Sequence, residues 1–255
     1  MILILRQLID CLQRRLQVPT ILVNSMAEAR NYESAQEAPA ARLANIVVNI
    51  CDLLSSAKKD TTNKTNLSCY ISRLLSIDTD LEDWTKTLPA EYKYTALTSP
   101  AGMGDAEVFM GRYDGYSNRD FAHTWNLQRC TRIVLRQTLI EAISKHFHTP
   151  SSPSMVPSLP LSYEHLFHTS NTIIQKSSVE ICSSVLYILH SGGKTGKSSD
   201  LRASCIIHLL WPLYIAGTAH TASHTLRNWV LSIMERAESV TGIQKAKLIA
   251  STIRR

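Results

Sequence analysis

Two histidines, His220 and His224, have the i, i+4 spacing that places two imidazole rings on one face of a helix, as in many metal sites. The residues between them are Thr, Ala and Ser, so the glutamate base of the zinc-protease pattern is missing. No cysteine pair of the C-x-x-C type is present to complete a ligand set. We therefore predict no metal site and no cofactor for this chain.

A second candidate is the segment SGGKTGKSS, in which Gly196, Lys197 and Ser198 match the end of a phosphate-binding loop. The first glycine of that motif would stand at position 191, which is Ser191. A phosphate loop also follows a β-strand, whereas the preceding VEICSSVLYILH is typical of a helix. We interpret the segment as a basic turn between two helices.

Acidic residues gather at Asp78, Asp80, Glu82 and Asp83. A calcium loop would need glycine where Asp83 stands and glutamate where Pro89 stands. We predict instead a solvated helix face, or a capping pattern formed by Thr79 and Glu82. Nucleophile elbows and dinucleotide-binding loops are absent from the sequence. We assign no catalytic residue and predict that the chain is not an enzyme.

Arg129, Arg132 and Arg136 form a stripe along a predicted helix, with Trp125 one turn earlier. The stripe suits an anion or nucleic-acid face with a stacking ring, or arginines that pair with carboxylates elsewhere in the fold. Residues 80–120 carry 8 acidic and 4 basic side chains, whereas residues 121–255 carry 6 acidic and 14 basic ones. We favour pairing, because residues 80–120 have an excess of acidic side chains and residues 121–255 have an excess of basic ones.

These residues must be positioned by helices, because the 255-residue chain has only 9 Gly and 9 Pro. Hydrophobic residues make up 44% and charged residues 19%, which excludes a disordered chain. The net charge of +6 and the pI near 9.0 permit a nucleic-acid or acidic partner without identifying one.

Apolar spacing predicts an all-α fold of about eight or nine helices. The first helix precedes Pro19 and is expected to bury Ile2, Leu5, Ile9, Leu12 and Leu16 on one face. The later helices are expected at about 20–32, 39–57, 67–87, 117–146, 163–190, 200–220, 223–240 and 243–253, the last after a stop at Gly242, with residues 90–116 irregular. Prolines mark 149–161 as a linker, so we predict one helical domain over 1–255, or two packed halves, 1–148 and 162–255.

The stretch from Ala203 to Leu226 contains no Asp, Glu, Lys or Arg and is long enough to span a bilayer. It also contains three histidines and Pro212, so we predict a buried helix that is kinked or broken at the proline, and no membrane span. The six cysteines are expected to be reduced core residues, and the sequons at Asn63 and Asn66 to stay unglycosylated.

Five segments occur in a fixed order: LPAEYKY (88–94), RDFAHTWNLQRCTRIVLRQTLIEAI (119–143), VEICSSVLYIL (179–189), LLWPLYIAG (209–217) and RNWVLSIMERAESVTGIQKAKLIA (227–250). This series resembles the signature blocks in the regulatory region of fungal zinc binuclear-cluster transcription factors. The sequence departs from that pattern at Tyr92, where a Trp is usual, and its cysteines are too widely spaced for the six-cysteine zinc cluster. The resemblance assigns motif positions, which we interpret as mainly structural, to Trp125, Asn126, Arg129, Arg132, Trp211, Pro212, Trp229 and Gly242.

The resemblance implies the all-helical fungal-specific transcription factor domain, acting in the nucleus without a DNA-binding module of its own. Expected partners are co-regulators or the transcription machinery, a second copy of the chain, or a small-molecule effector. We expect no sequence-specific DNA binding and no membrane binding, and zinc only in the missing module. The alternative is a small-molecule-binding or catalytic helical protein that uses residues 203–226.

Overall fold

The structure is a computed structural model that describes most of the chain. The described residues are 2–35, 37–59, 67–98, 108–147, 159–190 and 203–254. The predictions for Asn63, Asn66, the segment SGGKTGKSS and nearly all of the Pro-rich linker lie outside them.

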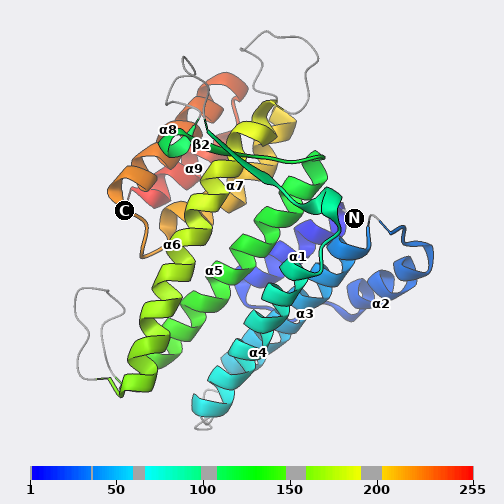
Figure 1. Ribbon diagram of the computed structural model, residues 1–255, viewed down its shortest axis with the longest axis vertical. Helices are drawn as coiled ribbons and strands as arrows, with labels where there is room; N and C mark the ends of the chain where they lie inside the picture. Colours follow the sequence, from blue (N-terminus) through cyan, green and yellow to red (C-terminus); the bar gives the residue numbers. More distant parts are fainter. Residues whose placement is uncertain are drawn as a thin grey trace. The chain divides into compact units, whose positions relative to one another are not determined.

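The described residues form nine α-helices and one two-stranded sheet, which confirms the predicted all-α fold (Figure 1). In chain order they are α1 (Ile2–Arg14), α2 (Thr20–Ala29), α3 (Ala38–Lys59), α4 (Leu67–Lys86), β1 (Thr95–Thr98), β2 (Arg112–Gly115), α5 (Arg119–Phe147), α6 (Leu161–His190), α7 (Ala203–Thr218), α8 (His224–Thr241) and α9 (Gln244–Ile253). Short 3-10 helices, η1 (Arg30–Tyr32), η2 (Ala90–Tyr92) and η3 (Phe109–Gly111), join some of these elements.

The chain divides into two compact units whose boundaries differ from the predicted halves 1–148 and 162–255. The first unit comprises Met1–Leu88 and Thr138–Thr149, and the second comprises Pro89–Gln137 and Pro150–Arg255. The Pro-rich segment does not separate them by itself, because α5 supplies its first part to one unit and its last part to the other.

In the first unit, α3 packs against both α1 and α4. The indole of Trp84 in α4 donates a hydrogen bond of 2.7 Å to the carbonyl of Pro39 at the start of α3. By length and composition, α3 is the one helix in the described ranges that could cross a membrane, over Ala38–Lys58, and half of that window is buried. The apolar part of α7, Cys205–Thr218, is shorter than a bilayer requires.

The predicted apolar face of α1 is wrong in part. The most deeply buried residues of the helix are Leu8, Cys11 and Leu12, whereas Leu16 is 38% exposed. The reason is a helix end at Arg14: Arg15 has a φ of 52°, and the amide of Leu16 donates back to the carbonyl of Cys11. Leu16 therefore lies beyond the last helical turn and cannot follow the buried face.

In the second unit, α6 packs against α7 and β2, and α7 packs against α8 and α9. Residues 90–116, predicted as irregular, contain the antiparallel pair β1 and β2, with Thr95 opposite Gly115 and Thr98 opposite Arg112. Positive φ angles at Met110 and Gly111 turn the chain just before β2. Each strand has only four residues, so its alternating pattern is a weaker signal in the sequence than the pattern of the neighbouring helices.

Two predicted features of the later helices have different outcomes. Helix α7 continues through Pro212 from Ala203 to Thr218, so the predicted break at the proline is wrong. Helix α8 does end at Gly242, which has the left-handed φ of 68° and donates its amide to the carbonyl of Glu238 at 2.7 Å.

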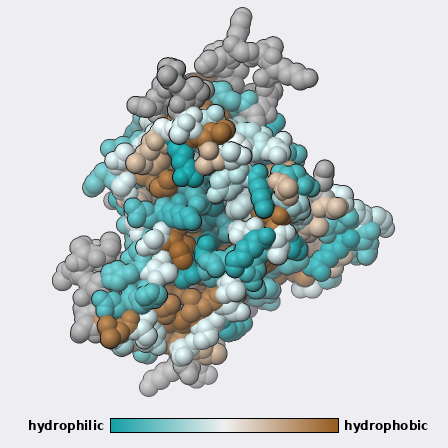
Figure 2. All heavy atoms as spheres, viewed as in Figure 1, coloured by the Kyte–Doolittle hydropathy of each residue, from teal (hydrophilic) through white to brown (hydrophobic). Residues whose placement is uncertain are grey.

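Exposed apolar side chains are scattered over both units. On the face drawn in Figure 2, hydrophilic residues dominate and hydrophobic ones form small separated groups. Single exposed residues of this kind are ordinary and do not by themselves mark a docking surface.

Candidate functional site

The most elaborate polar site lies in the second unit around Arg129 of α5, whose side chain is 1% exposed. One terminal nitrogen of its guanidinium donates to the Tyr116 hydroxyl at 2.8 Å and to Oδ1 of Asn126 at 3.2 Å. The other donates to Oδ2 of Asp114 at 3.1 Å, in an ion pair whose two side chains are both buried. Arg129 thereby joins β2 to α5.

A second set of contacts extends the site to α6 and to two aromatic rings. The Arg129 Nε lies 3.5 Å from Oε2 of Glu180. The amide of Asn126 donates to the Ser184 hydroxyl at 2.8 Å. The guanidinium carbon lies 4.9 Å from the ring centre of Tyr94 and 5.5 Å from that of Trp125. We call this set the Arg129 cluster; its members are Tyr94, Asp114, Tyr116, Trp125, Asn126, Arg129, Glu180 and Ser184.

The electrostatics of the Arg129 cluster are those of a closed, internally paired site. Burial by itself would lower the pKa of Arg129, but Tyr116, Glu180 and the other neighbours raise it, so the guanidinium stays charged. Burial raises the pKa of Asp114, and the charge of Arg129 opposes that rise. Burial also raises the pKa of Tyr116. These groups hold one another in place and leave no activated acid, base or nucleophile facing solvent.

The arginine stripe is therefore a packing feature. Arg129 pairs with Asp114, which lies in the acidic 80–120 segment, as the charge balance predicts. Arg136 is also buried, at 6% exposure, and Arg132 is partly buried. A solvent-exposed anion face along this stripe is excluded by the burial of Arg129 and Arg136.

Aromatic contacts tie the segment LPAEYKY to α5. The Trp125 indole donates to the carbonyl of Tyr92 at 2.8 Å. The rings of Tyr92 and Phe121 stack with their centres 3.8 Å apart. The rings of Tyr94 and Trp125 meet edge to face, with their centres 5.0 Å apart. Tyr92 thus fills the position at which the resembling family usually has Trp.

The remaining motif positions lie on α7 and α8. Trp229 packs against Phe109 with ring centres 5.3 Å apart. The indole nitrogens of Trp211 and Trp229 are buried without a hydrogen-bond partner in the described part of the chain. A side chain at Gly217 would approach Ile253 to 2.9 Å and Val230 to 3.2 Å, so the glycine lets α7 approach α8 and α9 closely. These positions serve helix packing.

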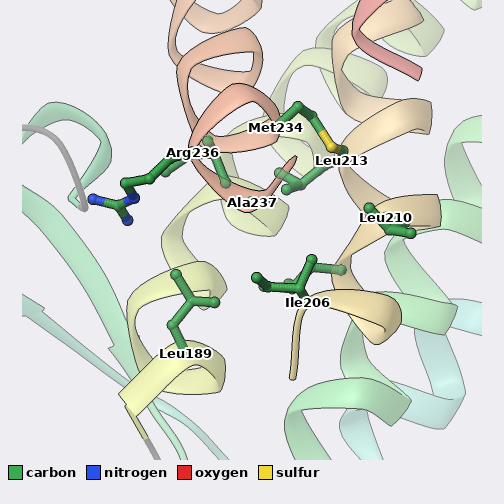
Figure 3. Close-up of a pocket in the computed structure, with 9 residues that line it drawn as sticks. Leu189, Ile206, Leu210, Leu213, Met234, Arg236 and Ala237 are labelled. Atoms are coloured by element: carbon green, nitrogen blue, oxygen red, sulfur yellow. The ribbon is translucent and has the colours of Figure 1, made fainter. Parts of the chain in front are cut away.

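One cavity lies among α6, α7 and α8 and is drawn in Figure 3. Its walls are Leu189, Ile206, Leu209, Leu210, Leu213, Ile233, Met234, Arg236 and Ala237. In Figure 3 the Arg236 guanidinium points away from the apolar side chains. The cavity volume of about 10 Å³ is room for about one water molecule, so this cavity is a packing defect and not a ligand site.

A larger cavity of about 200 Å³ opens between η3, α6 and the start of α8. Its walls are Phe109, Met110, Gln175, Ser178, Val179, Thr221, Ala222, Ser223, Thr225 and Leu226. The Thr221 hydroxyl oxygen is buried and has no hydrogen-bond partner among the described residues. Five wall residues come from the uncharged segment 203–226. Both apolar side chains and neutral side chains that can form hydrogen bonds line this cavity.

The histidine pair does not share a helix face. His220 lies in the turn between α7 and α8, where its Nε2 is 2.6 Å from Oδ1 of Asn171. Ser223 accepts a hydrogen bond from the amide of Leu226 and caps α8, so His224 is the first helical residue. The i, i+4 spacing therefore does not place the two rings on one helix, in keeping with the predicted helix boundary between 220 and 223. No group of three metal-ligating side chains occurs in the ranges that the structure describes.

The acidic group at the end of α4 divides by burial. Asp80 and Asp83 are exposed, and Asp83 pairs with Lys86 at 2.9 Å, as expected of a solvated helix face. Asp78 is 3% exposed, so that expectation is wrong for this residue. The helical period places Asp78 one turn before the core residue Leu81, on the buried side.

Three of the five segments that resemble the transcription factor blocks thus contribute side chains to one buried site. Asp114 and Tyr116 belong to none of these segments, and sequence reasoning missed them as named partners of Arg129. Comparison of the chain with protein families, curated proteins and solved structures finds no match in any of the three.

Proposed function

We propose that this chain is the regulatory domain of a fungal transcriptional regulator of the zinc-cluster type, acting without its own DNA-binding module. One observation carries the proposal. The first three resembling segments, which are far apart in sequence, supply Tyr94, Arg129 and Glu180 respectively to the same buried cluster. Order along the chain and convergence in space are together more specific than any single short motif.

The proposed mechanism is binding. A co-regulator, the transcription machinery, a second copy of the chain or a small effector would prefer one arrangement of the domain and shift its population. The Arg129 cluster supports such a domain by fixing β2 against α5 and α6. The described residues contain no group of three metal-ligating side chains, and we assign no catalytic step.

A tethering experiment tests this function. The chain is fused to an unrelated DNA-binding domain in a fungal reporter strain, with the DNA-binding domain alone as control. We expect reporter output to rise or fall several-fold when the fused chain is present in the nucleus. Equal output from fusion and control at matched nuclear abundance would contradict the proposal.

DNA binding by the chain itself is a separate expectation. The six cysteines are separated by at least 18 positions, so they cannot form a compact zinc cluster within one short segment. We expect only weak, salt-sensitive and sequence-independent DNA binding from the net charge of +6. A nanomolar gel shift that distinguishes one DNA sequence from others would overturn this expectation.

A second candidate function is small-molecule binding by the segment 203–226. The observation that favours it is the cavity of about 200 Å³ with the unpartnered Thr221 hydroxyl. Ligand sites for drug-sized molecules usually span about 300–1,000 Å³, so this cavity suits only a small, uncharged molecule. We expect a bound ligand to raise the melting temperature, and Thr221→Val to reduce that rise while Thr241→Val does not.

A further inference from the structure

A compact group of nitrogen-bearing side chains lies at the junction of α5 and α7 in the second unit. The imidazole rings of His123 in α5 and His208 in α7 have their centres 4.6 Å apart at an angle of 43°. Arg119, one turn before His123, donates from its guanidinium to the Cys205 sulfur at 3.1 Å. His208 is exposed and the other two basic groups are partly buried, so the group is open to solvent.

Asp120, the residue after Arg119, is an acidic side chain within electrostatic reach of this group. Arg119 donates to the sulfur of Cys205 and makes no ion pair with a carboxylate in the described part of the chain. Burial, His208 and Arg119 lower the pKa of His123 to about 4. Burial and Arg119 also lower the pKa of His208, while the nearby Asp120 opposes this. Both shifts favour the neutral form of the rings.

Three classes of ligand are conceivable for such a group. A metal ion would need at least three close ligand atoms from histidine, cysteine or carboxylate, and no such set occurs in the described ranges. A cation would be repelled by Arg119. A tetrahedral oxyanion would offer several oxygens to the guanidinium and to both rings.

We propose that Arg119, His123 and His208 form a binding site for a phosphate anion, free or as a small phosphate monoester. The guanidinium supplies the fixed charge and two or more donors. Each ring can add a donor, and the bound anion would favour the protonated form of both rings. Tyr187 of α6 lies within electrostatic reach of Arg119. This inference does not depend on the transcriptional role proposed above.

The test follows the ring protons of His123 and His208 by NMR in the intact chain. Inorganic phosphate and methyl phosphate are titrated separately to about 20 mM against chloride at constant ionic strength, a range that detects even millimolar affinity. The variants are Arg119→Gln and His208→Gln, with Lys245→Gln on the exposed side of α9 as the matched control. Because His208 is exposed, its replacement should leave the fold intact.

We expect both rings to shift in a saturable way and the pKa of His123 to rise by about one unit with phosphate bound. Arg119→Gln should weaken binding by about tenfold and His208→Gln by a smaller factor, whereas Lys245→Gln should leave it unchanged. Binding of methyl phosphate would identify the phosphoryl group of an ester as the ligand, and its failure would identify the free anion. Absence of saturable shifts, or equal binding by wild type and Arg119→Gln, would overturn the proposal.

Discussion

Replacing Arg129 by methionine removes the only arginine from a site that holds two carboxylates. Asp114 is then fully buried without its ion-pair partner, and its second oxygen, Oδ1, already lacks a hydrogen bond among the described residues. Loss of one partner from a buried pair costs about 3–5 kcal/mol. For a unit of this size, that loss lowers the melting temperature by about 6–20 °C.

The matched change, Asp114→Asn, should cost less, about 1–3 kcal/mol, because Arg129 keeps Glu180 and Tyr116 as partners. The double variant should be more stable than the sum of the two single effects predicts, with a coupling of about 1–3 kcal/mol. As a control, Lys247→Met breaks an exposed pair with Glu238 and should change the free energy of unfolding by less than about 0.5 kcal/mol.

The assay is urea unfolding followed by tryptophan fluorescence in a Trp84→Phe background. Trp84 belongs to the first unit, so the remaining tryptophans, which all lie in the second unit, report on the Arg129 cluster. Every variant is compared with the parent that carries the same background change. A cost below about 1 kcal/mol for Arg129→Met, or strict additivity with Asp114→Asn, would refute a buried ion pair at this site.

Three further changes test separate parts of the structure. Gly242→Ala should destabilise α8 by about 1 kcal/mol in urea unfolding, since its φ of 68° is unfavourable for alanine, and an unchanged stability would contradict the left-handed helix end. His123 has a pKa of about 4 in the folded chain, below its ordinary 6.5, so the unfolded chain takes up the proton first as the pH falls. In phosphate-free buffer, the free energy of unfolding should therefore decrease by at most about 3 kcal/mol as the pH falls from 6.5 to about 4. His123→Gln should make this decrease smaller. Cys69 is the one exposed thiol of the six, so a thiol reagent should modify one site quickly in the native protein and none in Cys69→Ser; rapid modification of Cys51, whose pKa burial raises to about 12, would contradict its burial.

The helical fold could be predicted because the signals that begin and end its helices are local in the sequence. Gly242 ends α8 through its own backbone conformation, and prolines and apolar periodicity bracket the other helices. Local signals failed where a neighbouring residue decided the outcome. The positive φ of Arg15 ends α1 before Leu16.

The Arg129 cluster could be predicted only in outline. Charge balance indicated that Arg129 would pair with the acidic segment before it. The partner within that segment is Asp114 because the hairpin of β1 and β2 places β2 against α6, and a pairing of this kind depends on tertiary structure. Glu180 is 51 residues from Arg129 in sequence, and no local pattern reports such a contact.

We propose a transcriptional regulatory domain because three of the resembling segments converge on Arg129. The most direct test measures output from the tethered reporter for wild type, Arg129→Met and Lys247→Met at matched nuclear abundance. We predict that the wild-type chain and Lys247→Met change the output equally, and that Arg129→Met loses most of that change. Reporter output that the folded wild-type chain leaves unchanged, or that Arg129→Met changes as much as the wild-type chain does, would contradict the proposed function.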